Sequence, residues 1–210
     1  MKDNKIGNEF NNRINTKDIA IFGMLGGVMY VSKLLMSFLP NIHLIGTFIV
    51  AMTVVYGFRA LYPLYVFIFL EGLFNGFSTW WIPYLYIWLP LWGATMLLRT
   101  RTTPPAGNLA NIQPTPRAGN PANNHNIFKK YEIPIYCILN GLHGLLFGTL
   151  YAPFQAICFG LGFKGMLAWI VAGLPWDLMH ACGNIVCGLL IVPLIKLLRM
   201  CERLDTTTKG

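Results

Sequence analysis

The stretch LPWDLMHACGNIVCGLLIVPLIKLLR, residues 174–199, is apolar enough to cross a bilayer and ends in a basic cluster. Its first half nevertheless carries Asp177, His180 and Asn184. At 3.6 residues per turn, these three side chains share one stripe of a helix. Carboxylate, imidazole and amide groups are costly at membrane depth, so the stripe indicates a ligand site. Hydrogen bonding between the helices of a bundle is the alternative explanation.

The composition is that of an integral membrane protein. Of the 210 residues, 55% are hydrophobic and only 11% are charged, and the mean hydropathy is +0.52. Soluble domains carry about 25% charged residues. The apolar runs lack the alternation of a membrane barrel, so they predict helices. The net charge of +8 comes from basic residues that flank these runs, which is typical of membrane topology and not of nucleic-acid binding.

The sequence predicts an all-α bundle of six transmembrane helices with both termini in the cytoplasm. Under this topology, all of the 16 Lys and Arg residues except Lys33 and Lys164 lie on the cytoplasmic side, as the positive-inside rule requires. The expected parts are a cytoplasmic segment over 1–17, helices one to four over 18–98, a flexible cytoplasmic linker over 99–131, helices five and six over 132–199, and a cytoplasmic tail over 200–210.

Prolines predict where the spans bend. Pro83 and Pro90 remove helix hydrogen bonds and predict kinks in the fourth span. Pro153 predicts a bend or an end in the fifth span, and Pro175 predicts a break just before Asp177.

Polar and aromatic side chains also occur in the other spans. Glu71 and Asn75 lie one turn apart in the third span, and an intramembrane carboxylate needs a partner or a cavity. Trp81 and Tyr84 belong to an aromatic stripe of the fourth span, which packs, forms an interfacial belt or walls a ligand. Lys33, near the outer end of the first span, snorkels or faces a ligand.

Motifs for an internal energy source are missing from the sequence. It contains neither of the nucleotide-binding motifs GxxxxGK[ST] and GxGxxG. Its five cysteines also form no CxxC pair, the spacing typical of a metal site. The sequence therefore predicts no cofactor and no metal site. A pocket between helices would bind a small molecule, and any transport against a gradient would need an ion or a partner.

Four features of the sequence resemble one family of membrane proteins. Gly23-x-x-x-Gly27 in the first span is a small-residue pair that allows close helix approach, either within the bundle or to a partner. The second span opens with HLIGTF after a short outer loop, and the junction GFRALYP to the third span is short. The last span contains Asp-x-x-His-x-x-Gly-Asn followed by an apolar run and Pro. This layout resembles the substrate-capture (S) components of energy-coupling factor (ECF) vitamin transporters.

The resemblance covers 18–98 and 132–199, and it departs from the family in its longer 99–131 linker and in having glycine where alanine is usual in the first span. It implies a non-enzymatic protein of the bacterial cell membrane that captures a vitamin or related micronutrient at the outer face. It also implies a transmembrane coupling subunit that docks on Gly23 and Gly27, and two ATP-binding subunits that drive release inside.

We expect the substrate to be a flat heterocycle, and a cationic one suits the two acids and the aromatic wall. The residues expected to bind it are Trp81, Tyr84, His143, Asp177, His180 and Asn184, with Glu71 and Asn75 as second choices.

Two other functions remain compatible with these residues. A carrier that works alone would use Asp177 and Glu71 as ion or proton relays. An intramembrane enzyme would use Asp177 with His180, or Glu71 with His143, in acid–base roles, although no HExxH motif is present.

Overall fold

The computed structural model describes residue 14 and residues 16–102 and 122–207, and in these residues every regular element is a helix. The prediction of an all-helical fold is confirmed for these residues. The predicted segment 1–17 lies largely outside them. The elements are α2 (Thr16–Leu35), α3 (Ile45–Tyr56), the short 3₁₀ helix η1 (Gly57–Ala60), α4 (Leu61–Asn75), α5 (Tyr84–Ile87), α6 (Leu89–Thr102), α7 (Ala122–Leu145), α8 (Phe147–Cys158), α9 (Phe163–Gly188) and α10 (Ile191–Thr207).

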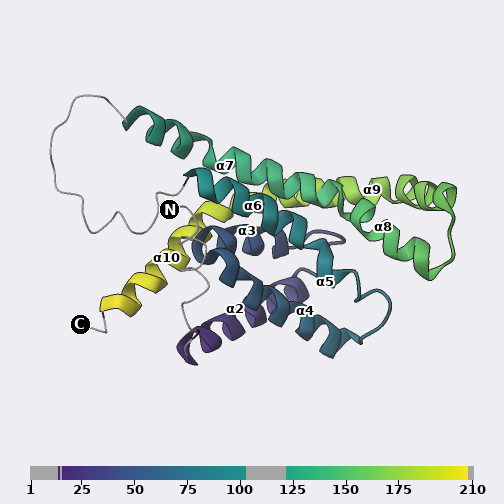
Figure 1. The fold of residues 1–210 in the computed structure, drawn as a ribbon, viewed down its shortest axis with the longest axis horizontal. Coiled ribbons are helices and arrows are strands. Elements are labelled where there is room, and N and C mark those ends of the chain that lie inside the picture. Colours follow the sequence, from purple (N-terminus) through teal and green to yellow (C-terminus); the bar gives the residue numbers. More distant parts are fainter. Residues whose placement is uncertain (1–13, 15, 103–121, 208–210) are drawn as a thin grey trace, which may run out of the picture.

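Successive helices alternate in direction along the long axis of the molecule. In Figure 1, α2, α4 and the pair α7–α8 run toward one end, and α3, the pair α5–α6 and α9 run back. We name the two ends of the bundle. The cavity end is the end at which α2 and α4 finish and α3 begins, and the basic end is the opposite one. Gly57, with φ of +62°, makes the reversal between α3 and η1, a conformation that favours glycine.

Helix α3 is the centre of the bundle. Every residue from Ile45 to Val54 is buried, because this helix is apolar around its whole circumference. Helices α6, α7, α9 and α10 all contact it. By contrast, α2 leaves large apolar side chains such as Met24 and Leu35 exposed, as expected for a surface that faces lipid.

Four helical stretches of the described chain are long and apolar enough to cross a membrane. They are Thr16–Leu35, Ile45–Asn75, Ile133–Cys158 and Phe163–Gly188. The second of these includes α3, η1 and α4, between which the chain reverses. These stretches indicate a multi-pass membrane protein, and the six-span topology stays a prediction.

The prolines do not act where the sequence predicted. Pro83 precedes the first residue of α5 and Pro90 lies in the first turn of α6, where a missing N–H is tolerated, so neither kinks a helix interior. Pro153 lies inside α8, and the chain instead breaks earlier, at Leu146. Pro175 lies inside an unbroken α9, so the predicted break before Asp177 is wrong.

Two predicted boundaries also differ from the helices. Helix α6 continues to Thr102 and α7 begins at Ala122, so helices extend into both ends of the predicted 99–131 linker. The last apolar run is not one helix, because α9 ends at Gly188 and α10 starts at Ile191 in a new direction (Figure 1). Helix α10 then continues to Thr207, through most of the predicted tail.

Candidate functional site

A small polar cavity of about 270 Å³ lies at the cavity end of the bundle. Its walls come from the end of α2, the loop 36–44, α5, α8 and α9. The loop is fastened to α9, since Asn41 Nδ2 donates to the carbonyl of Trp176 at 3.4 Å. Ile42 also packs against Gly183, where a methyl group would lie 2.8 Å from Ile42 Cγ1.

Two histidines in the cavity wall have nitrogen atoms without hydrogen-bond partners. The rings of His43 and His180 lie 4.8 Å apart, edge to face. His43 Nδ1 and His180 Nε2 are both buried and make no hydrogen bond within the protein, and His180 is only 3% exposed. An unsatisfied buried polar atom is costly, so both nitrogens are available to a water molecule or a ligand in the cavity.

His43 precedes the apolar helix that starts at Ile45. Burial, together with the neighbouring His180 imidazole and the Lys33 ammonium, lowers the pKa of His43 well below its ordinary value. The ring is therefore neutral at pH 7 and offers one donor and one acceptor.

An aromatic layer supports these imidazoles. The Phe147 ring lies 4.8 Å from His180 and 5.7 Å from Trp88. Trp88 in turn stacks on His143 at 5.3 Å, and His143 Nε2 lies 2.8 Å from the carbonyl oxygen of Ile87. His143 is therefore buried behind the cavity wall and holds α7 to α5.

An ion pair closes the side of the cavity. Lys33 Nζ donates to Glu71 Oε2 at 2.6 Å and to the Tyr84 hydroxyl at 3.3 Å. The Lys33 side chain is 28% exposed, and Glu71 is 2% exposed. Asn75 Nδ2 also donates to Glu71 Oε2, at 3.4 Å. The Glu71 carboxylate therefore accepts hydrogen bonds from Lys33 and Asn75. Of the four residues in this cluster, only Lys33 and Tyr84 line the cavity.

The rest of the polar stripe on α9 holds helices together. Asp177 Oδ1 accepts a hydrogen bond from the Gly148 N–H at 3.0 Å, in the first turn of α8. Asn184 Nδ2 donates to the Asn140 carbonyl at 3.1 Å, and Asn140 Nδ2 donates back to the Asn184 carbonyl at 2.8 Å. These bonds join α9 to α7 and α8. For these residues, the polar stripe is therefore explained by hydrogen bonding between the helices of a bundle, the alternative to a ligand site.

The structure therefore brings together only some of the residues predicted to bind. Tyr84 and His180 line the cavity. Trp81 lies elsewhere, because its Nε1 donates to the Ile68 carbonyl at 2.8 Å and its ring packs on Phe77.

Sequence reasoning did not select His43 and Phe147 as binding residues, and it left Lys33 open. Two signals were available for them. Lys33 is one of only two cations off the predicted cytoplasmic side, and His43 follows directly on the short outer loop.

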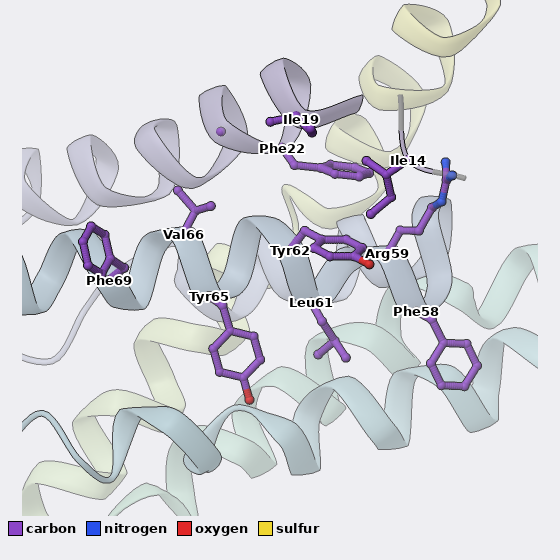
Figure 2. A pocket seen from close by; sticks show the side chains of 11 residues that line it. Ile14, Ile19, Phe22, Phe58, Arg59, Leu61, Tyr62, Tyr65, Val66 and Phe69 are labelled. Carbon is purple, nitrogen blue, oxygen red and sulfur yellow. The ribbon is translucent and has the colours of Figure 1, made fainter. Parts of the chain in front are cut away.

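A second, larger hollow lies at the surface of α2, η1 and α4. This groove has a volume of about 860 Å³ (Figure 2). Phe22 and Tyr62 stack in it at 5.7 Å, and Arg59, which pairs with Asp18 at 3.6 Å, lies at one end. Its lining is mainly apolar and includes no buried polar atom that lacks a partner, so it suits lipid or another helix better than a polar ligand.

The glycines of α2 face different surroundings. A methyl group at Gly26 would lie 2.5 Å from Val66 Cγ1 and 2.9 Å from the Pro63 carbonyl, so Gly26 allows α2 and α4 to pack closely. Gly23 and Gly27 have no atom within 4 Å of such a methyl group, and Gly23 lines the apolar groove. The small-residue pair is therefore open to an outside partner.

In the part of the chain that the structure describes, no three His, Cys, Asp or Glu side chains are grouped to hold a metal ion. No family model, curated protein or solved structure shows a significant match to this chain.

Proposed function

We propose that this protein is the membrane-embedded substrate-binding component of an ECF-type importer, which captures a vitamin or related micronutrient at the outer face of a bacterial cell membrane. The observation that carries this proposal is the polar cavity with two unpartnered imidazole nitrogens, on His43 and His180. Ligand pockets commonly combine apolar walls with a few convergent polar groups, and this cavity has Tyr84 and Phe147 as its aromatic walls.

The distribution of cations supports an outward-facing cavity. Arg59 and Arg99 lie at the basic end, since Arg59 belongs to η1 and the Arg99 guanidinium lies against Gly57, the first residue of η1. Lys17 lies in the first turn of α2 at the same end. Cytoplasmic faces of membrane proteins carry the excess of Lys and Arg, so the basic end belongs inside and the cavity outside. This orientation completes a six-span topology with both termini in the cytoplasm.

The exposed face of α2 supports docking of a transmembrane coupling subunit. Gly23 and Gly27 are open, and the apolar groove adjoins Gly23, so a partner helix has room to approach the backbone closely. Because the sequence contains no nucleotide-binding motif, two ATP-binding subunits would supply the energy for release inside the cell.

Binding and transport separate this function from its alternatives. The purified protein in lipid nanodiscs should bind its ligand without any partner. Vesicles that contain it alone should accumulate nothing, and addition of the coupling subunit and ATP-binding subunits should start uptake. Accumulation by the lone protein on an ion gradient would instead identify a solo carrier, and a chemically altered ligand would identify an enzyme.

The docking surface has a matched test. Gly27→Leu should abolish complex formation with the coupling subunit and leave ligand affinity intact, because the added side chain fills the open face of α2. Gly173→Leu on α9 is the control, since Gly173 also has no atom within 4 Å of a methyl group. Pull-down measures the complex and calorimetry the affinity. An intact Gly27→Leu complex would refute this docking face.

A further inference from the structure

The charges around the cavity are one-sided. Among the described residues that line it, Lys33 supplies an ammonium and none supplies a carboxylate. Glu71 lies behind Lys33, and Asp177 contacts the first turn of α8. The two acids that the sequence offered to a cationic ligand are thus turned away from the cavity.

The ammonium of Lys33 has hydrogen-bonding capacity left. An ammonium has three N–H donors, and Lys33 uses two, toward Glu71 Oε2 and the Tyr84 hydroxyl. Its ion pair with the more deeply buried Glu71 directs the positive end of the pair toward the cavity. An anionic group on the ligand would meet a charge-assisted donor there, whereas a cation would meet a like charge.

The walls favour a flat ring. Tyr84 and Phe147 present aromatic side chains to the cavity, and His43 and His180 present unpartnered nitrogens. Aromatic side chains pack well against planar groups, and imidazole nitrogens suit ring heteroatoms that donate or accept hydrogen bonds. A volume of about 270 Å³ lies below the usual range for drug-sized ligands, so the ring system is small.

We infer that the cavity selects a small planar heteroaromatic acid. Its carboxylate contacts Lys33 Nζ, its ring packs against Phe147 and Tyr84, and its ring heteroatoms bond to His180 Nε2 and His43 Nδ1. This inference rests on the proposed function, because it takes the cavity as the capture site. It specifies a substrate class opposite in charge to the cationic heterocycle that the sequence suggested.

A matched series of probes tests the charge preference. Pyridine-3-carboxylate, pyridine-3-carboxamide and N-methylpyridinium-3-carboxamide share one ring and differ in charge, and quinoline-3-carboxylate tests a larger ring. In titrations of the lone protein in nanodiscs, we expect at least one carboxylate to bind, the amide to bind about tenfold more weakly or worse, and the cation not to bind. Equal or tighter binding of the amide or the cation overturns the inference, as does failure of both carboxylates to bind the folded protein.

Variants assign the contacts. Lys33→Gln combined with Glu71→Gln removes both charges without leaving a buried carboxylate unpaired, and it should abolish the preference for acid over amide. Lys164→Gln, an exposed lysine at the start of α9 outside the cavity, should leave the preference unchanged. A double variant that keeps the preference removes Lys33 from the site.

His180→Phe tests the ring nitrogen. It should lower the affinity for pyridine-3-carboxylate to that for benzoate and leave benzoate binding unchanged, since benzoate offers no ring nitrogen to His180 Nε2. An equal loss for both acids would show a merely structural role for His180.

The two proposals can fail separately. Binding of the acid by a protein that never assembles with a coupling subunit refutes the importer and keeps the substrate class. Assembly and ATP-driven uptake of a cation refutes the substrate class and keeps the importer.

Discussion

Asp177 illustrates how one carboxylate can position a site without lining it. Its Oδ1 accepts the Gly148 N–H in the first turn of α8, where the N–H groups have no partner within the helix. A negative charge at this helix end is also favourable because of the helix dipole. Phe147, the preceding residue, is thereby held against His180 in the cavity wall.

This role predicts different outcomes for two substitutions at Asp177. Asp177→Ala leaves the Gly148 N–H unsatisfied and should cost about 1–3 kcal/mol of stability. Asp177→Asn keeps an acceptor oxygen and should cost about 1 kcal/mol or less, which thermal unfolding in detergent would measure. Full stability of Asp177→Ala together with lost ligand binding would contradict this role and place the carboxylate on the ligand.

Single residues also mark where sequence reasoning stops. The cost of burying Glu71 predicted a partner, and the sequence contained Lys33, but their pairing depends on α2 and α4 lying side by side in parallel. Likewise, periodicity placed His180 and Asn184 on one stripe correctly. Periodicity could not show that His180 lines the cavity while Asn184 bonds to α7, because both roles need a polar side chain in the same helical register.

At the scale of elements, α7 and α9 form the closest helix pair near the site. A methyl group at Gly144 of α7 would lie 3.0 Å from the Ala181 nitrogen and 3.0 Å from the His180 carbonyl carbon. Both atoms belong to the backbone of α9, so no rotamer change can relieve the contact. The reciprocal bonds between Asn140 and Asn184 close the same interface.

Gly144→Ala should therefore separate α7 from α9 and cost about 1–3 kcal/mol. It should also weaken ligand binding, because His180 lies at the contact. Gly173→Ala is the control, since its methyl group meets nothing within 4 Å and alanine favours the helix by about 1 kcal/mol. Thermal unfolding of both variants tests this packing, which a Gly144→Ala protein as stable as the parent would exclude.

The apolar runs of the sequence predicted that these helices exist. They did not predict the residues at which the helices end. The run from 174 to 199 stays apolar through Leu189 and Leu190, so hydropathy cannot show that α9 stops at Gly188. The turn is set by packing instead, because α10 buries Ile191 and Ile195 against α3. Tertiary contacts of this kind override local propensity.

At the scale of the whole molecule, the separation of charge and cavity has a mechanistic consequence. The basic end and the cavity end lie at opposite ends of alternating helices, so in the proposed orientation the basic end would meet the cytoplasm and the cavity would open to the outside. The central helix α3 runs between these ends and has no charged residue, and its polar side chains Thr47 and Thr53 are buried. Under the proposed function, release inside would therefore need a movement of the protein that carries the ligand away from the outer face, driven by its partners.

The native cysteines provide a test of this orientation. Cys158 is exposed at the end of α8 beside the turn into α9, and Cys201 is exposed on α10. A variant that keeps only Cys158 should react with a membrane-impermeant maleimide on intact cells. A variant that keeps only Cys201 should react only after the cells are permeabilised, because the basic end is expected to face the cytoplasm.

The matched background decides whether this labelling reports topology. Cys137 and Cys187 are buried and should be replaced by Ala to preserve packing, whereas exposed Cys182 can be replaced by Ser. A cysteine-free protein with normal thermal stability gives the background level of maleimide labelling. If Cys201 reacts on intact cells and Cys158 does not, the cavity faces the cytoplasm. Capture from outside would then be impossible for this protein, and the cavity would have to bind an intracellular ligand.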